Sequence, residues 1–370
     1  MSNDEMDKQF GSTNVTPTAI PRRASIILVV ADGLGCGDLS CYGQTNFQTP
    51  NLDKLAAEGM RFTNYYAGDA AGSPARAALM LGRDSKHLRQ RADADIPLAP
   101  DEITVAQMLQ QSGYHTGLIG EWNLGGENSS GAPWKKGFDD FAGYFDTNDA
   151  ENFYADYVFR YAPRSIYDET TKQFNTFTGR NGILENTSGQ KGKYIPDLLT
   201  QAALNYIQIN QPDLSNRYRP FFLLLNYKIP GDGKSQVPTD APFSEENWPQ
   251  PAKNKAAMIA RLDGYIGQLM DQLQKLGMTN NAAIFFTSAT VPDKTAAVNP
   301  NYFHSVASTN DLRVPMIAHW PGQIPAGTVS GFKCSARDFL PTAAKIAFTK
   351  PPEGVDGASV LPVLQERAKK

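Results

Sequence analysis

The residues of this sequence that could do chemistry follow its apolar runs. Asp32 comes after the run IILVVA, Glu121 after GLIG, and Thr290 after AAIFFTSA. Pro74 and Arg76 lie in the first turn of a predicted helix. A helix N-terminus with an arginine beside it is suited to an anion, and two facing carboxylates are suited to acid–base chemistry of the glycosidase kind. These residue types and spacings thus allow an anion site or a carboxylate pair.

The same groups also have structural roles, and we expect those. Asp32 comes directly before Gly33, so its carboxylate can cap the glycine-rich turn that follows the strand. Arg76 can form an ion pair with Glu121 or with Asp32, and such a pair would be structural. Nothing else in the sequence supports a glycosidase pair of Glu121 and Asp32. We therefore expect Arg76 to hold a carboxylate of the chain rather than a bound anion.

The elements that must position these groups are apolar runs that alternate with helical periods from residue 25 onward. The runs lack strict alternation of apolar and polar residues, which predicts an α/β fold with a mostly parallel central sheet and helices on both faces. Sites in such folds form at the carboxyl ends of the strands. We expect strands at Ser25–Ala31, Thr116–Gly120, Phe221–Asn226, Ala283–Ser288 and Pro315–Trp320, and helices at Asn51–Glu58, Pro74–Leu81, Asp101–Gln111, Pro196–Ile209 and Lys253–Leu276.

Length and composition narrow the class of protein. A chain of 370 residues, 41% hydrophobic and 20% charged, fits two domains or one large α/β unit. The net charge of −3 gives no basic excess for nucleic acid, and no apolar run is long enough for a membrane span. Three cysteines without a CxxC motif indicate neither a disulfide framework nor a zinc site.

We expect one folded domain with two irregular stretches. Residues 1–22 form a polar tail that lacks the basic and apolar regions of a signal peptide, which predicts a cytoplasmic protein. Residues 23–370 form a single α/β domain. Within it, residues 126–195 are rich in Gly, Asn, Asp and aromatic residues and predict a loop-rich excursion. Residues 228–254 contain five prolines and predict a long loop.

Longer phrases of the sequence resemble a known family. The signature blocks of the sulfatases, in the alkaline-phosphatase superfamily, are similar to IILVVADGLGCGDLSCYG, TPNLDKLAAEGMRFTNYYAGDAAGSPARAALMLGR, SGYHTGLIGEWNLG and RVPMIAHWPGQIPAGTVS. The resemblance extends in the family order from about Ile26 to about Pro362. It implies a domain like the N-terminal α/β domain of sulfatases. Because the sequence ends soon after the last block, we expect the smaller C-terminal subdomain of the family to be missing.

The resemblance also implies a mechanism. In the family, a cysteine or serine at the head of C/S-x-P-x-R is converted to formylglycine, whose hydrate attacks sulfur. A Ca²⁺ or Mg²⁺ ion held by oxygen ligands lowers the pKa of that nucleophile and neutralises the sulfate. Lysine and histidine side chains bind the ester oxygens and protonate the leaving group.

This chain departs from the family at the positions that would carry the reaction. The nucleophile position is Gly72, and only the arginine of that signature is kept, as Arg76. The lysine and histidine of G-K-W-H-L-G become Glu121 and Asn123. The histidine after the proline of FFLLLNYKIP becomes Gly231. We therefore predict that the chain has no catalytic residues of the family kind.

The metal-binding positions are changed as well. The paired aspartates of the family's A-D-D appear as Asp32 and Gly33, and its later Asp-Asn pair appears as Ala289 and Thr290. Because Ca²⁺ takes about six to eight oxygen ligands, usually with several carboxylates, one aspartate should bind it poorly. We predict no metal ion and no cofactor, with Asp32 and Arg76 as vestiges of the family site.

These departures together predict a catalytically degenerate, sulfatase-like protein. We expect a structural or interaction subunit of a larger protein assembly, formed with a protein partner or with a second copy of the chain. One alternative is a divergent hydrolase of sulfuric or phosphoric esters, and another is a non-hydrolytic binder of a sulfated or anionic ligand. Glu121 argues against both alternatives, because its negative charge would repel an anion.

The surface that meets a partner is not given by any motif. We expect the contact in the tail, residues 1–22, or in the excursion, residues 126–195, because both depart from the compact core. We expect no nucleic acid, no membrane span and no small-molecule ligand.

Overall fold

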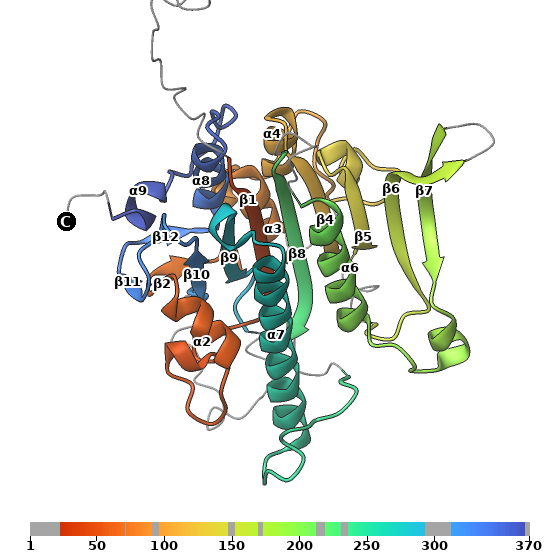
Figure 1. Ribbon diagram of the computed structural model, residues 1–370, viewed down its shortest axis with the longest axis vertical. Helices are drawn as coiled ribbons and strands as arrows, with labels where there is room; N and C mark the ends of the chain where they lie inside the picture. The colour runs from red at the N-terminus through yellow and green to blue at the C-terminus, as the bar shows by residue number, and fades with distance from the viewer. Residues whose placement is uncertain are drawn as a thin grey trace, which may run out of the picture.

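The computed structural model describes residues 23–70, 72–90, 96–146, 152–168, 173–211, 219–230, 236–292 and 312–366 (Figure 1). The expected tail, residues 1–22, lies outside these described residues. The strands are β1 Ser25–Asp32, β2 Met60–Phe62, β3 Tyr65–Tyr66, β4 His115–Glu121, β5 Asp140–Tyr144, β6 Tyr157–Asp168, β7 Gln173–Gly182, β8 Phe221–Pro230, β9 Ala282–Ser288, β10 Met316–His319, β11 Thr328–Ser330 and β12 Cys334–Ser335. Ten of them form one sheet in the order β11-β2-β10-β9-β1-β8-β4-β5-β6-β7, and β3 pairs with β12.

The central strands of this sheet are parallel. The neighbours β9, β1, β8, β4 and β5 all run in one direction, which confirms the mostly parallel sheet expected from the unbroken apolar runs. In β1, Ile26 and Leu28 face one hydrophobic core while Ile27 and Val29 face the other. A strand with a core on each side can carry apolar residues at every position, and this is why its sequence shows no alternation.

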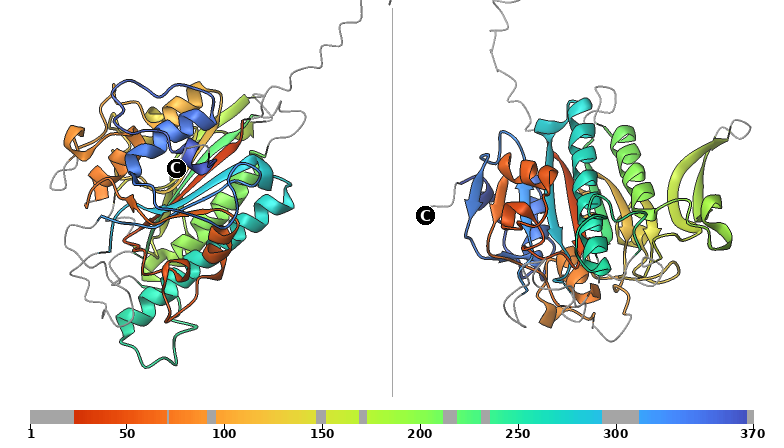
Figure 2. Two further views of the ribbon diagram at one scale, coloured as in Figure 1. Left: turned by 90° about the vertical axis from the view of Figure 1, so that its left-hand side faces the viewer. Right: turned by 90° about the horizontal axis from the view of Figure 1, so that it is seen from below.

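Helices cover both faces of the sheet (Figures 1 and 2). Their bounds are α2 Pro50–Ala57, α3 Gly72–Leu81, α4 Val105–Gln111, α6 Ile195–Ile209, α7 Gln250–Lys275, α8 Phe339–Ile346 and α9 Leu361–Leu364. The buried residues of α2, α6 and α7 belong to one core, and those of α3, α4, α8 and α9 belong to the other. The layers are thus helices, sheet and helices, as the sequence predicts.

The longest helix, α7, shows how the sequence builds one of these layers. Leu262, Ile266, Leu269 and Leu273 recur at helical spacing, and all four are buried. Burial of each such side chain contributes roughly 1.5–3 kcal/mol relative to exposure. Gly277 follows the helix with φ +65, the left-handed conformation that ends helices and that glycine adopts without strain.

The stretch of residues 126–195 differs from the expected loop-rich excursion. It contributes β5, β6 and β7, and the antiparallel hairpin of β6 and β7 extends the sheet at one end (Figure 1). The physical reason is its aromatic content, because Tyr and Phe favour strands and pair across them. The rings of Phe141, Phe145 and Phe159 pack against one another beside β5.

The proline-rich stretch of residues 228–254 is shorter as a loop than expected. Its first residues belong to β8, which continues to Pro230, and its last residues belong to α7, which begins at Gln250. The described part between them, residues 236–249, contains neither helix nor strand. The continuation of β8 matters for the site, because it carries Lys228 to the end of the sheet.

Within the described residues, no helix is both long enough and apolar enough to cross a membrane.

Candidate functional site

The strand ends bring the polar residues together at one edge of the sheet. Asp32 is the last residue of β1 and Glu121 the last of β4, and β8 lies between these two strands. The register pairs Asp32 with Pro230 and Gly120 with Asn226, so the ends of all three strands meet. The Asn226 side-chain amide donates to the main-chain oxygen of Glu121 at 2.6 Å, which fixes the end of β4 against β8. This strand-end edge is the candidate site.

Arg76 forms a buried ion pair at this edge. Its Nη2 atom lies 2.5 Å from Glu121 Oε2 and 3.6 Å from Asp32 Oδ2. The side chains of Arg76 and Glu121 are only 4% and 0% exposed. The expected pairing of Arg76 with carboxylates of the chain is confirmed. It is positioned by α3, whose first residue is Gly72, two residues before the start expected from Pro74.

Asp32 is held by a lysine and a threonine. Lys228 Nζ lies 2.6 Å from Asp32 Oδ2, and Thr290 Oγ1 donates to Asp32 Oδ1 at 2.7 Å. The expectation that Asp32 caps its own turn is wrong, because the amide of Gly33 donates to Thr290 Oγ1 instead. The buried carboxylate meets a cation from β8, which satisfies it more strongly than a backbone amide could.

The position that carries the nucleophile in the family signature is next to Arg76. A Cβ atom added at Gly72 would lie 2.8 Å from Arg76 Nη1 and 3.7 Å from Asn123 Nδ2. The guanidinium thus fills the space in which a side chain at position 72 would begin. The hydroxyl of the next residue, Ser73, donates to the main-chain oxygen of Asn123 at 3.2 Å. Gly231, another predicted degenerate position, lies outside the described residues.

Charge pairing shifts the pKa values of Asp32 and Lys228 in opposite directions. Burial favours the neutral acid, but the charges of Arg76 and Lys228 hold the pKa of Asp32 below its usual value of 3.8. Burial likewise favours the neutral amine, but the charges of Asp32 and Glu121 raise the pKa of Lys228 above its usual 10.5. Both groups are therefore ionised at neutral pH, and both shifts stabilise the folded state there.

These shifts predict how stability depends on pH. The contribution of Asp32 is present above its unfolded pKa and is lost as pH falls through the folded value. The contribution of Lys228 is present below its unfolded pKa and is lost as pH rises through the folded value. We expect the free energy of unfolding of the wild type, measured by urea denaturation, to fall below about pH 4 and above about pH 10 relative to an Asp32→Asn/Lys228→Met variant. Parallel pH curves for the two proteins would contradict this.

The divalent ion that the family resemblance implies does not fit these residues. Asp32 Oδ2 is already bound by Lys228, and the side chains of Gly33 and Ala289 have no oxygen to offer. At ~4 Å and an effective dielectric of about 20, a divalent ion and the Lys228 ammonium would repel by about 8 kcal/mol. Within the described ranges, no group of three or more His, Cys, Asp or Glu side chains could hold a metal ion.

Two site residues were missed by sequence reasoning, and one of them left a signal. Lys228 is the one charged residue of the run FFLLLNYKIP, and a charged side chain in a mostly apolar strand indicates a buried partner of opposite charge. Asn226 belongs to the same run, but an amide that joins two strands has no distinctive sequence pattern. The strand was predicted to end at Asn226, which placed Lys228 in a loop, so its contact with Asp32 was not predicted.

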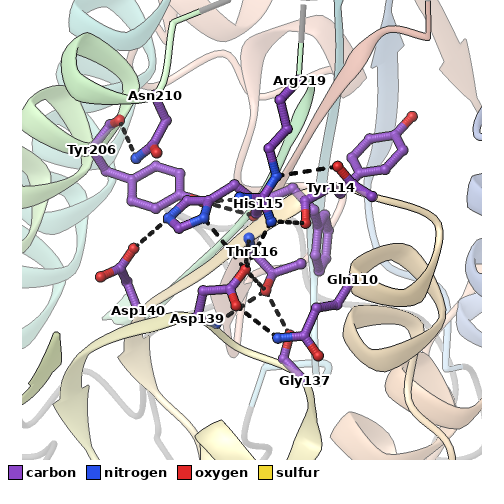
Figure 3. Close-up of polar contacts among 12 residues, drawn as sticks. Gln110, Tyr114, His115, Thr116, Gly137, Asp139, Asp140, Tyr206, Asn210 and Arg219 are labelled. Atoms are coloured by element: carbon purple, nitrogen blue, oxygen red, sulfur yellow. Dashed lines mark hydrogen bonds and ion pairs between the residues drawn. The ribbon is translucent and has the colours of Figure 1, made fainter. Parts of the chain in front are cut away.

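A second polar cluster lies at the other end of β4 (Figure 3). His115 Nε2 lies 2.7 Å from Asp140 Oδ2, and His115 Nδ1 lies 3.4 Å from Asp139 Oδ2. The imidazole stacks on the ring of Tyr206, with centroids 5.9 Å apart, and Arg219 Nη2 lies 3.8 Å from Asp139 Oδ2. These contacts join the starts of β4 and β5 to α6, so His115 belongs to the scaffold, as expected.

Known proteins resemble this chain along most of its length. The sequence model of the sulfatase family, described as Sulfatase, matches residues 24–348. N-acetylgalactosamine-6-sulfatase of Canis lupus familiaris is 30% identical, and the alignment covers 93% of this chain and 66% of that protein. Arylsulfatase A of Homo sapiens is 29% identical, with 94% of this chain and 68% of that protein covered. The chain spans about two thirds of the length of these curated relatives.

The fold also resembles that of a solved structure. The crystal structure of Ps i-CgsB in complex with k-i-k-neocarrahexaose superposes with a TM-score of 0.74 at 26% sequence identity, and the match covers 93% of this chain and 77% of that one. The family match includes the strands β1, β4, β8 and β9 that form the candidate site. On the sequence and on the fold, this chain belongs to the sulfatase family.

Proposed function

We propose that this sulfatase-family chain is non-catalytic and acts as a structural or interaction subunit of a protein assembly. The observation that carries the proposal is the Arg76–Glu121 pair beside Gly72. Position 72 has no side chain to act as a nucleophile, and the guanidinium lies 2.8 Å from where its Cβ would be. The arginine that the family signature keeps is bound to a carboxylate of the chain at 2.5 Å.

The electrostatics of the edge support the same proposal. Asp32 and Glu121 carry two negative charges and Arg76 and Lys228 two positive charges, so the four side chains are paired within the chain. An anionic ester would have to separate one of these pairs in order to bind. At ~4 Å and an effective dielectric of about 20, it would also meet about 4 kcal/mol of repulsion from each carboxylate so exposed. The arrangement favours a closed ion-pair network over a substrate site.

The interaction role is supported by the hairpin of β6 and β7. This hairpin lies at the end of the sheet, and β7 is the outermost strand among the described residues (Figure 1). A ten-residue strand with an open edge is a template for pairing with another chain, since its outer N–H and C=O groups need partners. The open edge of β7 supports a contact in the range 126–195, one of the two regions expected from the sequence.

Hydrolysis of sulfuric esters is the second candidate, and the relatives favour it. The proteins that resemble this chain at about 29–30% identity are named N-acetylgalactosamine-6-sulfatase and arylsulfatase A. A chain of this family could reach the same chemistry with a rearranged site. It would then need a nucleophile other than position 72 and a way to open the Arg76–Glu121 pair. Retention of a sulfated ligand without turnover would also require that opening.

Turnover assays separate these candidates. We expect the purified chain to release no sulfate or phosphate above the buffer rate from an aryl sulfate, an aryl phosphate or 6-sulfated N-acetylgalactosamine, with or without Ca²⁺ and Mg²⁺. A Glu121→Gln variant is the matched control, because it weakens the pair that closes the site. Saturable turnover by the wild type that this substitution changes would establish the hydrolase.

The mass of the native particle tests whether the chain is part of an assembly. We expect the chain to migrate in a native extract at a mass well above that of one copy, and to lose that larger species when the β6–β7 hairpin is shortened. Migration of the wild type at the mass of a single chain would contradict the interaction role.

A further inference from the structure

We propose that the Lys228 ammonium group is a built-in cation that takes the place of the divalent metal at the end of β1, so that this fold is complete without a metal ion. The inference does not depend on the proposed function, since a strand-end edge without a metal ion could belong to a non-catalytic protein or to an enzyme. It follows from where Lys228 lies, from the charges around it and from the oxygen atoms available there.

The backbone of β8 brings Lys228 to the end of β1, where the aspartates of the family would bind the metal ion. β8 continues to Pro230, whose Cα pairs with that of Asp32, and the register shifts between Val30 and Asp32. Tyr227 turns into the core on one face and bonds Thr200 there. Lys228 extends from the next position and reaches Asp32 Oδ2 at 2.6 Å, with only 16% of its side chain exposed.

The charges of the edge need this cation. With Lys228, the carboxylates of Asp32 and Glu121 are balanced by two cationic side chains. Without it, Arg76 is the cation that remains in an ion pair with Asp32 among the described residues, and its Nη2 atom is closer to Glu121, at 2.5 Å, than to Asp32, at 3.6 Å. Asp32 is 8% exposed and would be left with the neutral hydroxyl of Thr290 and a distant guanidinium. A buried carboxylate without a close cation is costly, so the lysine fills the electrostatic role of the metal.

The ligands of the edge suit an ammonium group better than a divalent ion. Ca²⁺ takes about six to eight oxygen ligands, and Mg²⁺ demands an octahedral set. The positions that would supply further carboxylates or amides hold Gly33 and Ala289. An ammonium group instead is a single point charge with three donors, and one carboxylate oxygen with a few neutral acceptors satisfies it.

Metal content and thermal melting of the full chain test the inference. We expect the purified wild type to hold no stoichiometric divalent metal by elemental analysis, and its melting temperature to be unchanged by EDTA or by millimolar Ca²⁺ or Mg²⁺. Lys228→Ala should melt several degrees lower, because Asp32 loses its close cation. So few oxygen ligands hold a divalent ion only weakly, but at millimolar concentration either ion should then raise the melting temperature of this variant, because Asp32 has lost its close cation. The wild type should show no such response.

Two further variants serve as controls. Lys228→Arg keeps a cation at the edge and should remain insensitive to divalent ions. In Asp32→Asn/Lys228→Ala, the carboxylate is gone, and the response to Ca²⁺ and Mg²⁺ should disappear with it. Stoichiometric metal in the wild type, a Lys228→Ala variant that melts like the wild type, or one that responds to neither ion would each overturn the inference. Turnover by a metal-free wild type would contradict the proposed function and leave this inference in place.

Discussion

Replacing Arg76 by alanine is expected to lower the free energy of unfolding by about 3–5 kcal/mol, because it removes the cation that lies against the buried carboxylate of Glu121. The side chain of Glu121 is 0% exposed and lies 2.5 Å from the guanidinium. Asp32 would lose its second cation, at 3.6 Å. Because the Glu121 side chain is buried, loss of the guanidinium leaves the desolvation cost of its carboxylate without the attraction that offsets it.

Urea denaturation of a matched set of variants measures this effect. Arg76→Lys keeps the charge but not the forked guanidinium, so it should be destabilised less than Arg76→Ala. An Arg76→Met/Glu121→Met double variant removes both charges and fills the space, and it should also be more stable than Arg76→Ala. An unchanged midpoint for Arg76→Ala would show that the pair contributes nothing and would contradict its structural role.

The fold was predictable wherever packing alone dictates the sequence. β1 is apolar at nearly every position because a core lies on each face, and a short unbroken apolar run is typical of such a strand. The buried residues of α7 were predictable for the same reason, because a helix packed against a core has apolar residues at helical spacing. The hairpin of β6 and β7 was missed, because its Gly and Asn residues are typical of loops while its aromatic residues are typical of strands. The pairing between the two strands decides between these tendencies, and pairing is not a local property.

The candidate site was predictable only in part, for a related reason. The pair of Arg76 and Glu121 could be inferred because two opposite charges at the same edge of a sheet must meet or be solvated. The partner of Asp32 could not, because Lys228 is 196 residues away in sequence and reaches Asp32 only if β8 continues beyond Asn226. Strand ends are set by a few hydrogen bonds with the neighbouring strands, and a short apolar run does not contain that information.

Replacing Gly120 by alanine is expected to cost about 4 kcal/mol or more, which is a large part of the stability of a typical domain. Gly120 has φ +114, a conformation that alanine adopts only with strain. A Cβ atom there would lie 1.9 Å from the main-chain oxygen of Asn226, so β4 and β8 could not keep their register. β4 is packed as closely on its other side, where a Cβ atom added at Gly143 of β5 would lie 1.8 Å from the main-chain oxygen of Gly120.

The loss of stability in Gly120→Ala would also show how far the candidate site depends on the contact between β4 and β8. Glu121 follows Gly120 directly, and its main-chain oxygen is held by the Asn226 amide at 2.6 Å. A separation of β4 from β8 would therefore withdraw the Glu121 carboxylate from Arg76 and weaken their buried ion pair. Gly126→Ala is the matched control, because a Cβ atom at that exposed glycine meets nothing within 4 Å, and its melting temperature should equal that of the wild type. If Gly120→Ala melted like this control, the two strands would not be held at the distance on which the Arg76–Glu121 pair depends.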